Sequence, residues 1–355
     1  MRPTQAIIDT AALKHNITIA RQRAPHSKLM AVVKADAYGH GAVNIAQVIC
    51  DDVEAFAVCC IEEAIELREA GIQQPILILE GFFESNELPL IQQYNLQTVI
   101  QHSFQIDILR TAKLNKPITT WLKIDTGMGR LGFLPEDFPH VWQQLNDIAH
   151  INKPLKLMTH LACADELDNS MTAQQIQQFN QLTQGYKTEK SIANSAGILG
   201  WQTAHADWNR MGIMLYGASP FDKQSYNLQP VMQLQSELIS IKHCKKGQTI
   251  GYGATWQCEH DSKIGVVAIG YADGYPRHAP SGTPVLINGQ RVPLAGRVSM
   301  DMLAVDLTQL PHAKVGDKAL LWGKSLPVEH IASLAGTISY ELLTHINKRV
   351  PRSVM

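Results

Sequence analysis

The stretch Ala31-Val32-Val33-Lys34-Ala35-Asp36-Ala37-Tyr38-Gly39-His40-Gly41 contains an apolar run, then a lysine, then two glycines where the backbone must turn. A short aliphatic run that ends in a turn is typical of a buried strand, and a helical pattern follows it. In a barrel built from strand–helix units, the reactive groups lie at the carboxyl ends of the strands. The stretch therefore predicts a strand–helix unit with Lys34 at its reactive end.

The same theme recurs up to about residue 217: a short apolar run, a turn containing Gly, Pro or Asn, and a longer segment with helical spacing. One helical segment, Cys60–Arg68, has acidic residues early and an arginine late, as the helix dipole favours. The eight predicted strands are Leu29–Lys34, Ala55–Cys60, Pro75–Leu79, Gln97–Gln101, Thr119–Asp125, Lys156–Leu161, Ser191–Asn194 and Arg210–Leu215. Eight strands, each followed by a helix, favour a closed (βα)8 TIM-type barrel over an open sheet.

After Pro220 the apolar runs become closely spaced, and the connections are too short for crossover helices. The predicted strands there are Glu237–Ile241, Gly265–Ile269, Pro284–Ile287, Arg291–Leu294, Met302–Val305 and Lys318–Leu321, and two helical segments, Val328–Leu334 and Tyr340–Lys348, close the chain. Asn288-Gly289 predicts a type I′ hairpin, because both central residues must tolerate positive φ. We predict a barrel over residues 1–225 and a mostly antiparallel β domain over residues 226–355.

Composition excludes several classes of function. The chain has 355 residues and a net charge of −1, so there is no basic surplus for nucleic acid. No stretch reaches the roughly 18 uninterrupted apolar residues of a membrane helix, and the amino terminus lacks the apolar core of a signal peptide. The six cysteines show no C-x-x-C pair, so no metal site is expected. We predict a cytoplasmic protein that binds neither nucleic acid nor membrane.

The predicted strand ends carry the candidate chemistry. Loss of hydration favours the neutral amine of a lysine, which can form a Schiff base, so Lys34 is either a reactive amine or a salt-bridged rim residue. The fifth strand leads into the glycine-rich loop Lys123–Gly132, where Arg130 could recognise a phenolate or carboxylate; otherwise Asp125 and Arg130 only pin the loop. His160, at the end of the sixth strand, could contact a flat ring or be a structural histidine.

The last two predicted barrel strands carry polar groups suited to a phosphate. Asn194-Ser195 follows the seventh, and Arg210-Met211-Gly212-Ile213 belongs to the eighth. The Ser195 hydroxyl and the Gly212 and Ile213 amides would form a phosphate-binding group, at the position where barrels often bind one. A phosphorylated ligand is therefore expected.

Together with three motifs of the second domain, these residues resemble bacterial alanine racemases over essentially the whole chain. The second-domain motifs are Gly251-Tyr252-Gly253, Gly270-Tyr271-Ala272-Asp273-Gly274-Tyr275-Pro276-Arg277 and Gly296-Arg297-Val298-Ser299-Met300-Asp301. The resemblance implies a pyridoxal 5′-phosphate (PLP) enzyme that interconverts L- and D-alanine. It also implies a head-to-tail homodimer in which each active site takes residues from both chains.

The resemblance assigns roles residue by residue. It makes Lys34 the Schiff-base lysine and one of two bases, and Tyr252 of the partner chain the other. It places Arg210 at the pyridine nitrogen, His160 and Asn194 beside the cofactor, and Arg130 at the phenolic oxygen and the substrate carboxylate. The phosphate would be held by Tyr38, Ser195, Gly212, Ile213 and Tyr340, and the substrate pocket would be completed by Tyr271, Met300 and Asp301. Lys123 would be a site of carbamylation.

Three alternatives remain open at this point. A PLP decarboxylase shares the barrel and β domain, but Tyr252, Tyr271 and Met300 indicate a small pocket and a second proton carrier. A non-catalytic PLP-binding protein would lack residues 231–355, and a racemase of broader specificity would resemble periplasmic proteins. One departure from the family is that Ser191 stands where some relatives have a histidine. The sequence leaves open whether D-alanine supplies peptidoglycan or alanine is catabolised.

Overall fold

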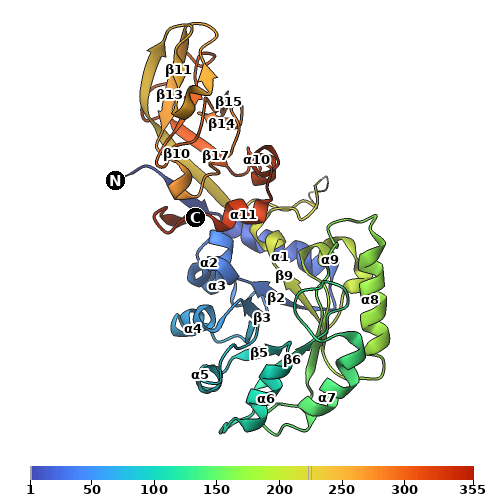
Figure 1. Cartoon of the computed structure of the whole chain (residues 1–355). Helices are drawn as coiled ribbons and strands as arrows, with labels where there is room; N and C mark the ends of the chain where they lie inside the picture. The colour runs from blue at the N-terminus through green and yellow to red at the C-terminus, as the bar shows by residue number, and fades with distance from the viewer. Residues whose placement is uncertain (1, 223, 225) are drawn as a thin grey trace.

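The first part of the chain forms a closed parallel barrel (Figure 1). The computed structural model describes residues 2–222, 224 and 226–355. Each barrel strand pairs with the next in chain order, and the last pairs with the first. The strands are β2 (Lys28–Val32), β3 (Ala55–Val58), β4 (Ile76–Ile78), β5 (Gln97–Ile100), β6 (Thr119–Lys123), β7 (Lys156–Met158), β8 (Lys190–Ser191) and β9 (Trp208–Met211). The predicted (βα)8 barrel is confirmed.

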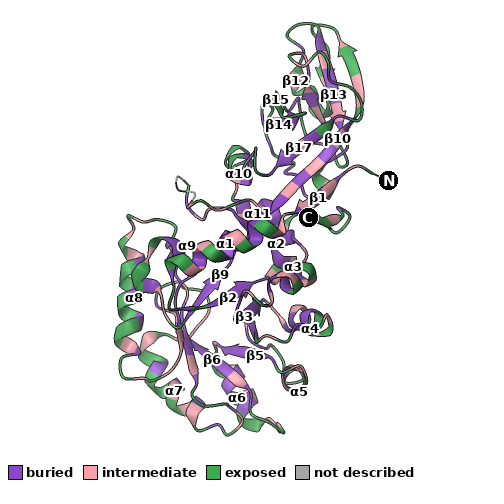
Figure 2. Ribbon diagram, turned by 180° about the vertical axis from the view of Figure 1, so that it is seen from behind, coloured by how far each residue is buried: buried purple, intermediate pink, exposed green. Residues whose placement is uncertain are grey.

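Helices surround the barrel and bury the outer face of its strands. They are α1 (Thr10–Arg23), α2 (Lys34–Gly39), α3 (Ala42–Ile49), α4 (Ile61–Glu69), α5 (Glu87–Gln93), α6 (Ser103–Thr111), α7 (Phe138–Asn146), α8 (Ser170–Leu182) and α9 (Ser195–Gly200). Figure 2 shows the strands buried and the outward sides of α7 and α8 exposed. Strands covered on both faces are apolar throughout, as the fully buried β3 is. No described helix is long and apolar enough to cross a membrane.

Most barrel strands end earlier than the sequence predicts. Strand β2 ends at Val32 rather than at Lys34, which instead begins α2. The predicted strand Arg210–Leu215 stops at Met211, and Ile213–Tyr216 forms a buried 3₁₀ turn, η3. The turn that follows a barrel strand is also buried, so its residues are apolar too. The apolar run therefore continues past the last hydrogen bond to the neighbouring strand and does not mark where the strand ends.

The second domain is a mostly antiparallel sheet. Its longest strand, β10 (Met232–Cys244), pairs with three neighbours. The other strands beyond residue 231 are β11 (Thr249–Ile250), β12 (Trp256–Gln257), β13 (Ser262–Val267), β14 (Pro284–Ile287), β15 (Gln290–Pro293), β16 (Leu303–Asp306), β17 (Lys318–Trp322) and β18 (Arg352–Val354). The β14–β15 hairpin has Asn288 and Gly289 at φ of 48° and 81°, as a type I′ turn requires.

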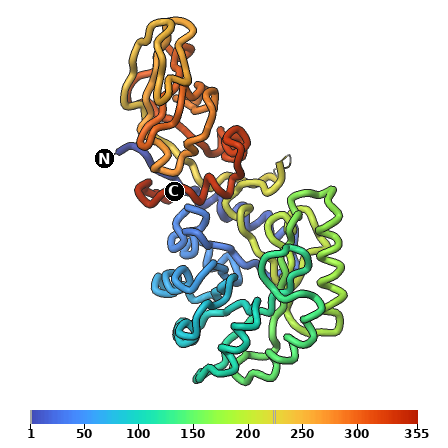
Figure 3. Tube along the Cα trace, viewed as in Figure 1, coloured from blue at the N-terminus to red at the C-terminus, as the bar shows by residue number. Residues whose placement is uncertain are grey.

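Both ends of the chain meet at the junction of the two domains. Strand β1 (Gln5–Ile8) pairs antiparallel with β10 and parallel with β18. Figure 3 shows the carboxyl-terminal segment lying beside the first residues of the chain. Residues 5–8 therefore belong to the second sheet, and the chain enters the barrel with α1. Residue 225, the predicted boundary, lies outside the described residues.

Two short helices complete the second domain. Helix α10 (Val328–Ala335) ends at Gly336, whose positive φ of 69° makes a left-handed cap. Helix α11 (Ser339–Thr344) lies against α2 at the mouth of the barrel (Figure 1). It is shorter than the predicted Tyr340–Lys348, since the backbone leaves the helix at His345. Its position brings Tyr340 to the barrel.

Candidate active site

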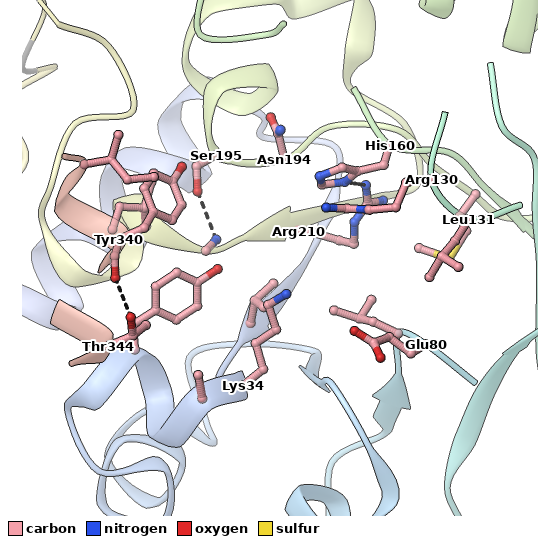
Figure 4. A pocket seen from close by; sticks show the side chains of 18 of the residues that line it. Lys34, Glu80, Arg130, Leu131, His160, Asn194, Ser195, Arg210, Tyr340 and Thr344 are labelled. Atoms are coloured by element: carbon pink, nitrogen blue, oxygen red, sulfur yellow. Dashed lines mark hydrogen bonds between the residues drawn. The ribbon is translucent and has the colours of Figure 1, made fainter. Parts of the chain in front are cut away.

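A cavity of 630 Å³ lies at the carboxyl ends of the barrel strands (Figure 4). It is bounded where β2, β6, β7 and β9 end, which is where barrel enzymes carry their chemistry. The structure brings together around it all the residues predicted to bind the cofactor: Lys34, Tyr38, Arg130, His160, Asn194, Ser195, Arg210, Gly212, Ile213 and Tyr340. Lys123 lines it too.

The charge of this lining is predominantly positive. Four cationic side chains, Lys34, Lys123, Arg130 and Arg210, face two acids, Glu80 and Glu341. Cations that burial brings together repel one another, so the arrangement is stabilised by an anionic ligand. The cavity is therefore suited to a small molecule with phosphate or carboxylate groups.

Arg210 is fully buried on β9 and is held by several acceptors. Its guanidinium donates to the Thr159 carbonyl at 2.8 Å, to the Ile192 carbonyl at 3.1 Å and to the Ser191 hydroxyl at 2.5 Å. Burial lowers the pKa of Arg210 to about 10, which leaves it protonated at neutral pH. Ser191 thus serves as a direct acceptor for this arginine.

His160 lies beside Arg210 (Figure 4), with its Nδ1 at 3.2 Å from a guanidinium nitrogen. Burial, followed by the nearby charges of Arg210 and Lys123, lowers the pKa of His160 well below its usual value. The imidazole is therefore neutral in the working range of pH. A neutral ring next to an arginine can contact a flat heteroaromatic ligand without adding charge.

The three residues of the predicted phosphate-binding group, Ser195, Gly212 and Ile213, all line the cavity. The Ser195 hydroxyl accepts hydrogen bonds from the Gly212 amide at 2.9 Å and the Met214 amide at 3.3 Å, with Ile213 lining the cavity between them. Asn194 caps α9 by accepting from the Gly197 amide at 2.9 Å. A side chain at Gly212 would place Cβ at 2.9 Å from the Tyr38 hydroxyl, so the Tyr38 ring would have to shift.

The loop after β6 is pinned by an acid and presents a cation. The Asp125 carboxylate accepts from the amides of Gly127, Gly129 and Arg130 at 2.9 to 3.1 Å. Burial opposes ionisation of Asp125, but these backbone donors lower its pKa below the usual value. The loop is thus pinned through its backbone, and the Arg130 side chain lies at the cavity (Figure 4).

Lys123 lies at the end of β6 and is buried. Burial, then the charges of Arg210 and Arg130, lowers the pKa of Lys123 to about 8. An amine with this pKa is substantially neutral at mildly alkaline pH, whereas an exposed lysine is almost entirely protonated. Lys123 can therefore act as a nucleophile toward carbon dioxide.

Sequence reasoning missed some residues that line the cavity. Glu80 lies two residues beyond β4, so the strand-end rule that found Lys34 would also have found it. Burial and the adjacent Glu80 raise the pKa of Cys59 to about 12, which removes this thiol as a nucleophile. Ile338, Glu341 and Thr344 come from the α11 region, which no barrel pattern points to.

Four predicted site residues lie on the second domain and do not line this cavity in the same chain. Tyr252 begins the 3₁₀ turn η4 (Tyr252–Ala254) between β11 and β12 and is 66% exposed. Met300 is 52% exposed and Tyr271 is 38% exposed, both unusual for large side chains of this type. Asp301 is also exposed, and Arg349 donates to its carboxylate at 2.5 Å. Among the described residues, no cluster of three or more His, Cys, Asp or Glu could hold a metal ion.

A cation-lined cavity at the carboxyl face of a (βα)8 barrel, followed by an antiparallel domain, defines a barrel enzyme for a small anionic ligand. Two family models cover almost the whole chain: alanine racemase, N-terminal domain, over residues 8–220, and alanine racemase, C-terminal domain, over residues 231–354. The chain belongs to the alanine racemase family.

Individual relatives agree with this assignment. An alanine racemase of Shewanella amazonensis is 50% identical over 359 residues, covering 99% of each chain. One of Vibrio vulnificus is 51% identical over 356 residues, again covering 99% of each. Among solved structures, a biosynthetic alanine racemase from Pseudomonas aeruginosa matches with a TM-score of 0.97 and 46% identity over the full length of both chains.

Proposed function

We propose that this protein is an alanine racemase that interconverts L- and D-alanine with PLP as cofactor. The observation that carries the proposal is the joint placement of Lys34, Arg210 and the Ser195–Gly212 group around one cavity, in a chain of the alanine racemase family. Its substrate is a small amino acid, whose carboxylate suits the cationic lining. We also propose a cytoplasmic location, which the six free cysteines support.

The residues of the cavity fit PLP. Tyr38, Ser195, Gly212, Ile213 and Tyr340 would hold the phosphate, where a Cβ on Gly212 would intrude. Burial raises the pKa of Tyr38 to about 12, so its phenol stays a hydrogen-bond donor to an anion. Arg210 would face the pyridine nitrogen and Arg130 the phenolic oxygen. PLP, when bound, withdraws electrons from the α-carbon of an amino acid and so makes its α-proton removable.

Racemisation requires the α-proton to leave from one face and return on the other. On one face the Lys34 Nζ would take or return the proton, from the position that the end of β2 gives it. Arg130 would bind the substrate carboxylate and fix the orientation of the α-carbon between the two proton carriers. His160, kept neutral by burial, would contact the cofactor ring without competing for the proton.

The second proton carrier would be Tyr252 of a partner chain. The exposure of Tyr252, Tyr271 and Met300 supports this, because large side chains exposed together on one domain mark an interaction surface. A head-to-tail homodimer would bring the second domain of each chain over the barrel of the other. A decarboxylase has no need of a proton carrier on the opposite face, which favours the racemase.

The direct test of the proposal uses the purified, PLP-loaded protein. With either L- or D-alanine alone, optical rotation should decay to zero, and the α-proton should exchange for deuterium in heavy water. Carbon dioxide release without racemisation would identify a decarboxylase. PLP binding without any exchange would identify a non-catalytic PLP-binding protein.

Gly212→Ala is expected to weaken PLP binding by on the order of ten-fold, because the new methyl group would lie at 2.9 Å from the Tyr38 hydroxyl. The measurement is titration of cofactor-free protein with PLP, followed by absorbance. Ser195→Ala, which removes the acceptor of the Gly212 and Met214 amides, should weaken binding in the same direction. Unchanged affinity in both variants would place the phosphate elsewhere.

Lys123 is expected to become carbamylated and so to turn one cation of the cavity into an anion beside Arg130. The neutral amine adds to carbon dioxide and releases one proton; with a pKa of about 8, roughly half of the side chains are neutral at pH 8. Protein in ¹³C-bicarbonate should show a carbamate carbon by NMR, and the signal should grow as pH rises through 8.

The corresponding variant is Lys123→Met, with Lys116→Met on the exposed surface as control. Lys123→Met should lose the carbamate signal and raise KM for alanine by about 10- to 100-fold, since Arg130 loses the anion that orients it. Lys116→Met should change neither quantity. A carbamate signal that survives in Lys123→Met would assign it to another amine.

A further inference from the structure

The turn that joins Lys34 to Tyr38 has an unusual backbone. Ala35, Asp36, Ala37 and Tyr38 all have φ of 52° to 53°, a single turn of left-handed helix without a glycine. L-residues avoid this region because Cβ approaches the carbonyl oxygen, and runs of four are exceptional. A turn of this kind persists only where the surrounding structure holds it.

Side chains of the segment itself and one from α4 make hydrogen bonds that fix this turn. The Glu63 carboxylate on α4 accepts from the Ala35 amide at 2.7 Å and from the Cys59 amide at 2.8 Å, so it ties the ends of β2 and β3 together. The Asp36 carboxylate accepts from the Ala42 amide at 2.8 Å. His40 Nδ1 lies at 2.9 Å from the Tyr38 carbonyl. Each contact fixes the turn from a different side.

A further contact, to the residue that follows the turn, comes from the other end of the chain. Arg352, on β18, donates from Nε and a terminal nitrogen to the Gly39 carbonyl at 3.1 and 2.9 Å. The same guanidinium donates to the carbonyls of Ile346 and Asn347 at 2.7 and 2.8 Å, and its side chain is only 10% exposed. Its nearest carboxylate is Asp36, at 3.8 Å.

The carboxyl-terminal segment packs against the turn at a second point. A Cβ on Gly39 would lie 2.1 Å from the Leu343 carbonyl oxygen, so α11 contacts the turn backbone directly. Helix α11 also carries Tyr340, whose ring centroid lies 6.0 Å from that of Tyr38. The contact between this turn and the carboxyl-terminal segment thus places both tyrosines at the cavity. Arg352 bonds to both parts of it, to Gly39 after the turn and to Ile346 and Asn347 after α11.

We propose that Arg352 is a positioning residue for the cofactor site: it holds the left-handed turn Ala35–Tyr38 and so makes PLP binding depend on the packing of the carboxyl-terminal segment. The inference rests on the proposed function of Lys34 and Tyr38 in holding PLP. If Arg352 were merely structural, its loss would lower the melting temperature alone. If it is a positioning residue, its loss also loosens the turn selectively and weakens PLP binding in the folded protein.

The test begins with the cofactor-free protein, prepared with hydroxylamine, and compares Arg352→Met with wild type. Hydrogen exchange of the amides of residues 35–42 should become at least about ten-fold faster, while that of β5 and β6 should stay unchanged. PLP titration should show affinity weakened by roughly ten-fold. The matched control is Arg110→Met, an exposed arginine on α6 that pairs with Asp107 of the same helix, which should alter neither quantity.

Two further variants keep the test decisive if Arg352→Met folds poorly. Arg352→Lys retains the charge but not the fork of donors, so it should give an intermediate effect on both readouts. Ala35→Gly removes the penalty of positive φ at an exposed position, so in the Arg352→Met background it should restore PLP affinity by roughly three-fold.

The two readouts separate the two hypotheses. If wild type fails to bind PLP, the proposed function fails, and hydrogen exchange still decides the role of Arg352. The positioning role is wrong if, in Arg352→Met, the amides of residues 35–42 exchange at the wild-type rate and PLP affinity is unchanged. It is also wrong if the loss of affinity is equally large with and without Ala35→Gly.

Discussion

Lys34→Ala is expected to lower the rate of alanine racemisation by about 10⁴-fold or more and to abolish α-proton exchange from at least one enantiomer. The variant loses both the amine that holds PLP and the proton carrier on one face. The other lysine of the cavity, Lys123, belongs to β6 and is buried, so it does not substitute for Lys34 from the end of β2. Racemisation is measured by optical rotation, and exchange is measured by NMR in heavy water.

The fold should tolerate this change, because Lys34 is half-buried and the neighbouring backbone is held without its side chain. The Val33 amide donates to the Ala57 carbonyl at 2.9 Å and the Ala35 amide donates to Glu63 at 2.7 Å. A melting temperature close to that of wild type is therefore expected, and Lys113→Ala at an exposed position serves as control. Added methylamine should restore part of the activity. Racemisation by Lys34→Ala within ten-fold of wild type would refute the assignment.

The barrel could be predicted because its strands are buried on both faces. Strand β3 and its neighbours are continuous apolar runs, each followed by a turn and a helical pattern. The same property hid the strand ends: Ile213–Tyr216 is as buried as β9 and more apolar, but it forms a 3₁₀ turn. The position of β1 could not be predicted, because Ala6 pairs with Leu234 and Arg352, far along the chain.

The strand-end rule placed Lys34, His160 and Arg210 at one cavity because parallel strands bring their carboxyl ends to one face. It could not place Tyr340, which lies on α11 beyond the barrel and was expected only from the family resemblance. The left-handed turn was also invisible, because Ala-Asp-Ala-Tyr contains no glycine and local preference favours a right-handed helix. Its cause is tertiary and lies in Glu63 and Arg352.

Tyr252→Phe is expected to lower racemisation by on the order of 10³-fold while leaving PLP binding unchanged, because only a hydroxyl on an exposed turn is removed. The variant should still exchange the α-proton of one enantiomer, since Lys34 continues to serve its own face. The other enantiomer should lose exchange. The control is Tyr94→Phe, whose hydroxyl bonds only to Glu69 at the barrel's outer helices and which should behave as wild type. Equal loss of exchange from both enantiomers would contradict a two-base mechanism.

The same two variants test whether each active site is shared between chains. In a mixed dimer, the barrel of the Tyr252→Phe chain has an intact Lys34 and receives an intact Tyr252 from the Lys34→Ala chain. The second site of that dimer lacks both groups. Random exchange makes half of the dimers mixed, so two inactive proteins, once combined, should regain about one quarter of wild-type activity. Activity that stays at the level of the separate variants after subunit exchange would mean that each chain supplies its own tyrosine. That result would require Tyr252 to reach a cavity it does not line in the single chain.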